Sequence, residues 1–301
     1  MRHLGRIVVL MLACQMQCAC SAGAQQGPEM DNFCVFYVRQ LPRGTEFNAT
    51  LCMGRDSALL LTSNLLGGSA IGVFEGRIEP SEVVPLRERL LSAEVRSVKP
   101  STMLRPGSLT TVFGLHSRSS EDFLVSLMRG EMNPSLLALE KEILRVAEQL
   151  RPFPKHVLSA SGSLKTGKVK RGSNLEFSVT LENAGRRAIK IDNPALDDPR
   201  LPRLVLQFTP DEDLEGGEYA EEPLTLGALR LGAGEPPPSG KALKLAPKVK
   251  LTLGFAKQIE LLPGRYQAKV AFRNTGQVLG ILETSIEGTL VIDLGTFTVE
   301  R

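Results

Sequence analysis

Residues 171–191 read RGSNLEFSVTLENAGRRAIKI, and this stretch decides the fold of the C-terminal half. Between Leu175 and Leu181 apolar and polar residues alternate, which is the period of a β-strand with one buried face. Asn183-Ala184-Gly185 has the composition of a turn, and Ala188–Ile191 continues as the next strand. The stretch therefore predicts short strands separated by a turn, as in an all-β domain.

Similar apolar stretches recur between His156 and Arg301, at the spacing of a β-sandwich. They are Leu204–Phe208, Val249–Phe255, Tyr266–Phe272 and Leu290–Val299. Residues 261–274 read LLPGRYQAKVAFRN, in which Pro263-Gly264-Arg265-Tyr266 leads into a late strand. Together with residues 171–191, this stretch resembles the immunoglobulin-like domains of exported bacterial proteins, and it is also similar to small bacterial proteinase-inhibitor sandwiches. The resemblance implies an all-β immunoglobulin-like sandwich over residues 156–301, a fold that serves many functions.

Residues 25–150 follow a different pattern, which predicts an α+β domain. Gly76-Arg77-Ile78-Glu79-Pro80-Ser81 returns as Gly130-Glu131-Met132-Asn133-Pro134-Ser135. Each copy follows an apolar strand and opens a helical pattern, with proline in the first turn and Asn133 as a helix cap. We expect an antiparallel sheet with two helices on one face, built from duplicated strand–strand–helix units. Residues 151–155 hold two prolines and are the expected linker.

Residues 1–24 have the pattern of an export signal. Arg2 and Arg6 precede the apolar run Ile7–Ala13, and Ser21–Ala24 offers a cleavage site between small residues. The run is far shorter than the roughly 20 residues of a transmembrane helix. A second processing site competes, because Leu12-Ala13-Cys14 resembles the end of a lipoprotein signal, in which Cys14 is lipidated. We expect a periplasmic or secreted protein, with the lipoprotein as the alternative.

Cleavage of the signal leaves two of the five cysteines, Cys34 and Cys52. Each lies in a predicted strand, and Pro42-Arg43-Gly44 between them suits a hairpin loop. A hairpin centred on Arg43 places Cys34 directly opposite Cys52, at the separation that a disulfide requires. The alternative is two buried free thiols, and the oxidising compartment favours the disulfide.

The composition excludes several classes of partner. Aromatic residues are 5% of the chain and there is no Trp, so stacking platforms for sugars or single-stranded nucleic acid are not expected. The formal net charge of +3 is too small for a nucleic-acid-binding surface. The three His residues supply little material for metal or imidazole chemistry.

One loop has the spacing of a calcium site. Asp211, Asp213, Glu215 and Glu222 stand at positions 1, 3, 5 and 12 of a loop with Gly216 at position 6. Pro210 and Pro223 border the loop where a calcium-binding helix pair would have its helices. A solvated acidic loop is the alternative, and it is the more common meaning of such a run.

The remaining motifs give no catalytic residues. Residues 162–168 fit the spacing of a phosphate-binding loop, but Val169 follows where a hydroxyl residue is needed, so a Gly-rich hairpin is the better interpretation. His116, expected at a strand end, and His156, expected at the linker, have no recognisable catalytic partners. Lys165, Lys168 and Lys170 are interpreted as a solvated strand edge.

We therefore expect a non-catalytic, protein-binding protein of a bacterial cell envelope without cofactors, for example an inhibitor or immunity partner of a secreted enzyme. Contact would be made by loops at one end of the sandwich, with Asp211–Glu222 and Gly232–Lys241 as the candidates. An envelope hydrolase with dispersed catalytic residues and a calcium-dependent adhesive module are the alternatives.

Overall fold

The computed structural model describes residues 33–41, 44–53, 57–62, 70–101, 110–117, 123–194, 202–211, 220–224, 229–230, 240–275 and 286–301. These residues lie mostly in antiparallel sheets, accompanied by three α-helices. The chain divides into two compact units. The N-terminal unit holds most residues up to Phe153. The C-terminal unit holds the residues from Pro154 onward, together with Gly44–Glu46 and Thr62–Val73.

The N-terminal unit contains a sheet with the strand order β4-β3-β2-β1-β5-β6. Its strands are β1 (Phe33–Leu41), β2 (Gly44–Met53), β3 (Ser57–Thr62), β4 (Ala70–Arg77), β5 (Thr110–Ser117) and β6 (Phe123–Met128). The pairs β1–β5 and β5–β6 are antiparallel. Buried apolar side chains along β1 and β5, such as Val35 and Phe113, supply the core of this sheet.

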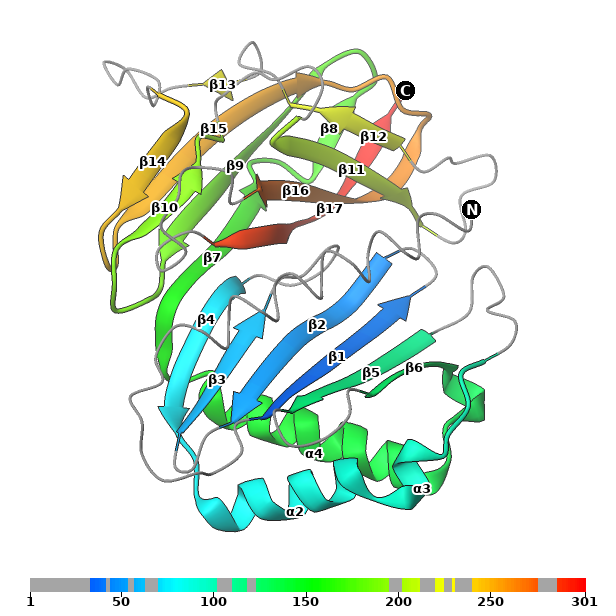
Figure 1. Ribbon diagram of the computed structural model, residues 1–301. Coiled ribbons are helices and arrows are strands. Elements are labelled where there is room, and N and C mark those ends of the chain that lie inside the picture. Colours follow the sequence, from blue (N-terminus) through cyan, green and yellow to red (C-terminus); the bar gives the residue numbers. More distant parts are fainter. Residues whose placement is uncertain are drawn as a thin grey trace. The chain divides into compact units, whose positions relative to one another are not determined.

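Helices cover one face of the N-terminal sheet (Figure 1). They are α2 (Pro80–Leu91), α3 (Ala93–Arg96) and α4 (Pro134–Leu150), with a short 3₁₀ turn, η1 (Arg129–Glu131), before α4. Asn133 caps α4 as predicted, because its side-chain oxygen accepts a hydrogen bond from Leu136 N at 2.9 Å. We expected two helices, and the short α3 is additional. It begins because Ser92 Oγ accepts a hydrogen bond from Val95 N at 3.3 Å.

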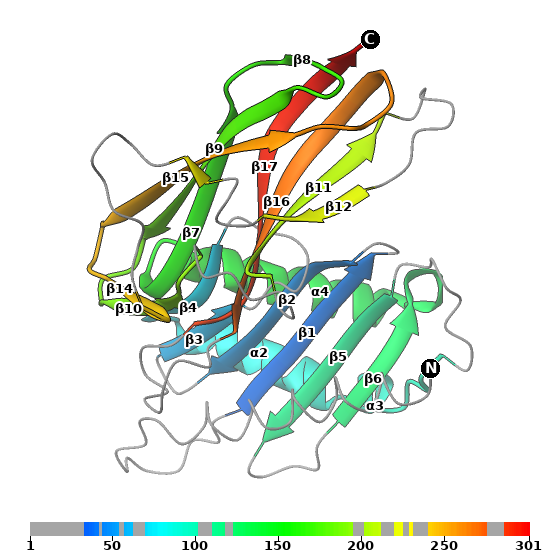
Figure 2. The same ribbon diagram turned by 90° about the horizontal axis from the view of Figure 1, so that it is seen from above.

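The C-terminal unit is all β in its described residues. Its strands are β7 (Pro154–Leu164), β8 (Lys168–Lys170), β9 (Asn174–Asn183), β10 (Ile189–Asp192), β11 (Leu204–Pro210), β12 (Ala220–Pro223), β13 (Leu229–Arg230), β14 (Ala242–Leu245), β15 (Lys250–Gln258), β16 (Gly264–Thr275) and β17 (Glu287–Glu300). Within the unit one sheet has the order β13-β15-β9-β7 and another the order β12-β11-β16-β17-β8, while β10 pairs with β14. Figure 2 shows β11, β16 and β17 side by side.

Side chains from both larger sheets of the C-terminal unit form one buried cluster. Phe177 of β9 stacks on Phe255 of β15 with ring centres 5.3 Å apart. Phe297 of β17 contacts the rings of Phe208 and Tyr266. The predicted inward positions of the first quoted strand are all buried, and they are Leu175, Phe177, Val179 and Leu181. The alternation of that stretch therefore predicted the buried face of β9 correctly.

Two expectations about chain organisation need correction. Pro154 and Lys155, expected in a linker, are the first residues of β7. They are ordered because Lys155 O accepts hydrogen bonds from the backbone N of Arg186 and Arg187 at 3.0 and 3.1 Å. His156 consequently lies on β7 as well.

Candidate functional site

The predicted disulfide between Cys34 and Cys52 is present, with the two Cα atoms 4.0 Å apart. It joins the neighbouring strands β1 and β2. Because disulfides persist in oxidising compartments, it suggests an extracytoplasmic location. Among the described helices, none has the length and apolar composition needed to span a bilayer. The predicted export signal, residues 1–24, and the alternative lipidation site at Cys14 lie outside the described residues.

Of the four predicted calcium ligands, the structure describes two, Asp211 and Glu222, and they lie far apart. Glu222 pairs with Leu206 in the β11–β12 ladder, and Asp211 lies five residues beyond Leu206 along the chain. That separation is about 17 Å along a strand, whereas a Ca²⁺ ion holds its oxygen ligands at about 2.3–2.6 Å. Asp211 and Glu222 therefore cannot bind the same ion.

Both described carboxylates of this set have cationic partners instead. Asp211 forms an ion pair with Arg265 at 3.7 Å, and Glu222 forms one with Lys257 at 2.8 Å. Asp213 and Glu215 lie outside the described residues, so calcium binding by the rest of the loop stays a prediction. Within the described part of the chain, no three His, Cys, Asp or Glu side chains are grouped to hold a metal ion.

The two histidines lie on strands of different units. His116 is in β5, where its backbone pairs with Cys34, and His156 is in β7. Two of the basic residues near β8 have acidic partners, since Lys165 pairs with Glu176 at 2.8 Å and Lys168 with Glu300 at 3.4 Å. The segment with phosphate-loop spacing runs from β7 into β8, and a strand follows it where a phosphate-binding helix would have to start.

Sequence reasoning missed a group of buried polar side chains at one end of the C-terminal unit. We name Asp192, Asn193, Arg203 and Asn274 the polar anchor. Asp192, Asn193 and Asn274 are each only 2% exposed. Arg203 Nη1 lies 2.9 Å from Asp192 Oδ2, and the arginine side chain is 11% exposed. A charged pair is buried in proteins only when it is well paired and hydrogen-bonded, so this group is a specific structural feature.

The polar anchor joins the ends of three connections between strands. Asp192 N, at the end of β10, donates to Asn274 Oδ1 of β16 at 2.7 Å. Asn274 Nδ2 donates to Ile286 O, directly before β17. Asp192 also pairs with Arg203, which precedes β11 and whose carbonyl accepts a hydrogen bond from Arg273 N at 2.8 Å.

Asn193 extends the polar anchor to β14. Its Nδ2 donates to Gly240 O at 2.8 Å, and its backbone N donates to Lys241 O at 3.1 Å. The residues on both sides of segments 195–201 and 276–285 are thus held together. Gly240, which follows segment 231–239, belongs to the same group. The ends of these connections form one fixed platform, which is the arrangement that binding loops require of a scaffold.

A third buried asparagine, Asn183, fixes the other end of the β10–β14 pair. Asn183 Nδ2 donates to Leu245 O and to Arg187 O, both at 2.9 Å. Its backbone O accepts a hydrogen bond from Lys248 N at 2.8 Å. Lys248 has a φ of 65°, a backbone conformation that few side chains adopt, and this turn leads into β15. Asn183 thereby ties the turn after β9 to the turn after β14.

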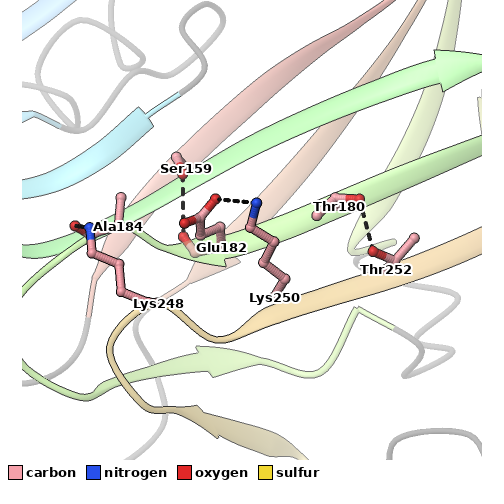
Figure 3. A network of polar contacts seen from close by, with 7 residues as sticks. All are labelled: Ser159, Thr180, Glu182, Ala184, Lys248, Lys250 and Thr252. Atoms are coloured by element: carbon pink, nitrogen blue, oxygen red, sulfur yellow. Dashed lines mark hydrogen bonds and ion pairs between the residues drawn. The ribbon is translucent and has the colours of Figure 1, made fainter.

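Polar contacts continue from this turn along the outer face of β7, β9 and β15. Lys248 Nζ donates to Ala184 O at 3.2 Å, and Lys250 pairs with Glu182 at 3.4 Å. The hydroxyls of Thr180 and Thr252 lie 3.0 Å apart. Figure 3 shows this network, whose labelled members are Ser159, Thr180, Glu182, Ala184, Lys248, Lys250 and Thr252. The contact from Ser159 Oγ to Glu182 O is half-buried. The others lie at the exposed surface, and each contributes little to stability.

The two loops that we expected at one end of the sandwich leave from opposite ends of β16. Asp211 N donates to Arg265 O at 2.9 Å, at the start of β16. Lys241 is held through Asn193 beside the polar anchor, which includes Asn274 near the end of that strand. The nine residues from Arg265 to Asn274 span about 30 Å. The described ends of the two loops are therefore far apart, and because residues 212–219 and 231–239 lie outside the described residues, the joint surface stays a prediction.

Comparison with known proteins gives no family. No protein-family model matches the chain, and no curated protein does. Three of the solved structures that match align with just under half of it. The CARDB domain of the PF1109 protein from Pyrococcus furiosus, in complex with di-metal ions, has 14% identity, 46% coverage of this chain, 93% of its own and a TM-score of 0.21.

The other two structures are enzymes. AvmM, which catalyses macrocyclization in alchivemycin A biosynthesis, has 15% identity, 48% coverage of this chain, 89% of its own and a TM-score of 0.25. An exo-β-N-acetylglucosaminidase from Vibrio harveyi has 13% identity, 48% coverage of this chain, 19% of its own and a TM-score of 0.19. These distant likenesses carry no conclusion about activity.

The signal that could have indicated the polar anchor is weak. In the sequence Ile189-Lys190-Ile191-Asp192-Asn193, two polar residues follow a predicted strand directly. Asn274, the partner of the Asp192 backbone N, is 82 residues away in the sequence. Periodicity identifies a strand, but it does not identify the distant residue that pairs with the strand's end.

Proposed function

We propose that the C-terminal unit is an immunoglobulin-like sandwich that binds another protein outside the cytoplasm. The strand orders β13-β15-β9-β7 and β12-β11-β16-β17-β8 support the fold. In an immunoglobulin sandwich, the first, second and fifth strands share one sheet, and the third strand lies with the last two in the other. Likewise, β7, β9 and β15 share one sheet in this unit, and β11, β16 and β17 share the other.

Tyr266 supports the same fold assignment. It is 1% exposed, lies near the start of β16, and its hydroxyl donates to Leu262 O four residues earlier at 3.0 Å. This is the geometry of the tyrosine corner, found at the start of the penultimate strand of immunoglobulin-like domains. Ala268 stands two residues after Tyr266, where antibody domains have the second cysteine of their intersheet disulfide.

The function that we propose is non-catalytic protein binding in a bacterial envelope or in the secreted fraction, with an enzyme inhibitor or immunity partner as the concrete form. The polar anchor is the observation that carries it. A buried ion pair and two buried asparagines hold the ends of three strand connections as one platform. Fixing the ends of loops lowers the entropy that they lose on binding, which raises the affinity of a loop surface.

The proposal is tested by capture from an envelope extract. The chain starting at Gln25 is immobilised through its C-terminus, and proteins that it retains are identified by mass spectrometry. In a first variant, a Gly/Ser segment of equal length replaces residues 276–285, which join β16 to β17 next to the polar anchor. We expect the wild type to retain a specific protein and this variant to lose it.

A matched control alters the other end of the same sheet. Residues 212–219, which leave from the end of β11 near Arg265, are replaced by a Gly/Ser segment of equal length. We expect this control to retain the partner. Capture of no specific protein, combined with activity against a panel of hydrolase substrates, would show that the protein is an enzyme. Equal capture by both variants would exclude the platform as the binding surface.

A further inference from the structure

Two lysines lie directly opposite each other on the β10–β14 pair. Lys190 pairs with Lys244 in the antiparallel register, between the pairs Ile189–Leu245 and Ile191–Leu243. Ile189, Ile191 and Leu245 are buried in the core, whereas Lys244 is exposed and Lys190 half-buried. Residues paired in this way have Cβ atoms about 4.5–5.5 Å apart. The two lysine side chains therefore start side by side on the outer face.

This pair departs from the charge arrangement of the neighbouring strands. Lys250 stands opposite Glu182 in the β9–β15 ladder, and the two form an ion pair at 3.4 Å. Lys165 of the β7–β8 turn pairs with Glu176 at 2.8 Å. Lys257 of β15 pairs with Glu222 at 2.8 Å. In these places the fold supplies a carboxylate for each lysine.

Lys190 and Lys244 have no such carboxylate among the residues that the structure describes. Asp192 is the one acidic residue within β10 and β14, and it is 2% exposed and paired with Arg203. Lys241, exposed and directly before β14, adds a third positive charge. Like charges placed directly opposite each other destabilise a sheet, so this arrangement does not serve folding.

The β10–β14 pair is also held rigidly. Asn193 fixes one end of it through Gly240 O and Lys241 O, and Asn183 fixes the other end through Leu245 O. The lysines therefore stand on a backbone that is already ordered before any partner binds. A ligand for this surface would be spared the cost of ordering the backbone.

We propose that Lys190 and Lys244 bind an acidic segment of the partner protein, through two or more Asp or Glu carboxylates. This inference rests on the proposed protein-binding function and specifies the chemistry of its partner. A protein segment is the ligand that follows from the proposed function, and anionic phospholipid is tested below as the competing ligand. The carboxylates would supply the counter-charge that the fold omits, as Glu182 does for Lys250.

The test measures binding of a fluorescent deca-glutamate peptide to the chain starting at Gln25, at low salt. The variant K190Q/K244Q removes the opposed charges. The matched control K165Q/K250Q removes two exposed lysines that already have carboxylate partners. We expect affinity to fall about tenfold in the first variant and less than about twofold in the control. Equal losses in both variants, or no binding by the wild type, would overturn the proposal.

A second variant separates binding from folding. K244E places a carboxylate opposite Lys190, so it should raise the melting temperature. It should also weaken peptide binding more than the neutral variant K190Q/K244Q does. A K244E protein that melts at or above the wild-type temperature and binds the peptide normally contradicts the proposal. Binding of the wild type to vesicles with anionic phospholipid, without binding to the peptide, would identify a membrane as the ligand and also contradict it.

The capture experiment distinguishes failure of this inference from failure of the proposed function. If the wild type retains an envelope protein that deca-glutamate does not displace, the protein-binding function stands and the lysine assignment is wrong. If deca-glutamate binds through Lys190 and Lys244 but no envelope protein is retained, the cationic surface exists and the proposed function is wrong.

Discussion

At the scale of single residues, Asp192 and Arg203 form the largely buried ion pair of the polar anchor. Taking two charges out of water costs several kcal/mol for each ion, and their mutual attraction repays that cost only with good geometry. Their 2.9 Å contact and the additional bond from Asp192 N to Asn274 provide such geometry. An apolar pair of similar volume would give the fold similar stability. We therefore infer that the ion pair serves to fix the ends of the strands.

This interpretation makes a prediction about one single and one double substitution. Asp192→Leu removes the carboxylate that pairs with the largely buried Arg203 charge and should lower the free energy of unfolding by about 3–5 kcal/mol. The double variant D192L/R203M removes both charges and should recover most of that loss. Urea unfolding of the three proteins measures the difference.

The same double variant separates stability from positioning. We expect it to retain its fold and to capture the partner of the wild type more weakly, because the ion pair that joins the end of β10 to the residue before β11 is removed. The control E176Q breaks the exposed ion pair with Lys165 and should change the free energy of unfolding by less than about 1 kcal/mol. A double variant as unstable as Asp192→Leu alone would contradict the interpretation.

Gly185 tests how closely the turn after β9 approaches the start of β7. A Cβ atom at this position would lie 2.6 Å from Lys155 O and 2.8 Å from Val157 N. Both are backbone atoms of a strand and cannot move aside cheaply, so Gly185→Ala should cost about 1–3 kcal/mol. Gly167→Ala is the control, since a Cβ there meets nothing within 4 Å. Thermal melting of the two variants compares them, and equal melting temperatures would refute the close approach.

At the scale of elements, helices α2 and α4 are joined by an ion pair that responds to pH. Arg145 of α4 lies 2.9 Å from Glu82 of α2, and Gln149 donates to the same carboxylate at 3.2 Å. Hydrogen bonds from Arg145 and Gln149 lower the pKa of Glu82 below its ordinary value of 4.5. A pKa that is lower in the folded state means that this carboxylate stabilises the fold while it is charged.

The direction of the pH effect follows from that shift. The stabilisation by Glu82 is present above pH 4.5 and is lost as the pH falls through the lower pKa of the folded state. Because the side chain is 28% exposed, we expect only a few tenths of a kcal/mol up to about 1 kcal/mol. E82Q should therefore lower the melting temperature at pH 7 and have little effect at pH 2.5. E88Q, at an exposed position of the same helix, is the control, and an equal effect of E82Q at both pH values would contradict the prediction.

The elements differ in how far the sequence could predict them. Alternation from Leu175 to Leu181 predicted the buried face of β9, and Asn133 before Pro134 predicted the start of α4. Both signals are local, since each depends on residues within a few positions. The pairing of β10 with β14 was not predicted, because register across such a distance leaves no periodic trace. The polar anchor was missed for the same reason.

Over the whole molecule, one covalent feature was predicted correctly. The hairpin argument that placed Cys34 opposite Cys52 used only turn chemistry and counting, and the disulfide is present. Counting could not show that Asp211 and Lys241 lie near opposite ends of β16. Their positions depend on the order of strands in a sheet, which is decided by the packing of the complete core.

The disulfide and the division into two units together predict how the protein unfolds. Both cysteines belong to the N-terminal unit, and the bond closes a loop with a sequence separation of 18. A cross-link of that length stabilises a fold by about 3 kcal/mol, mainly by restricting the unfolded chain. The variant C34S/C52S should therefore lower the melting temperature of the N-terminal unit and leave that of the C-terminal unit unchanged.

Differential scanning calorimetry should show one unfolding transition for each unit. Gly185→Ala identifies the transition of the C-terminal unit independently, because it should shift that transition alone. The wild type treated with a reductant should behave as C34S/C52S does, because the same constraint on the unfolded chain is removed. If C34S/C52S and Gly185→Ala shift one common transition, the units unfold cooperatively.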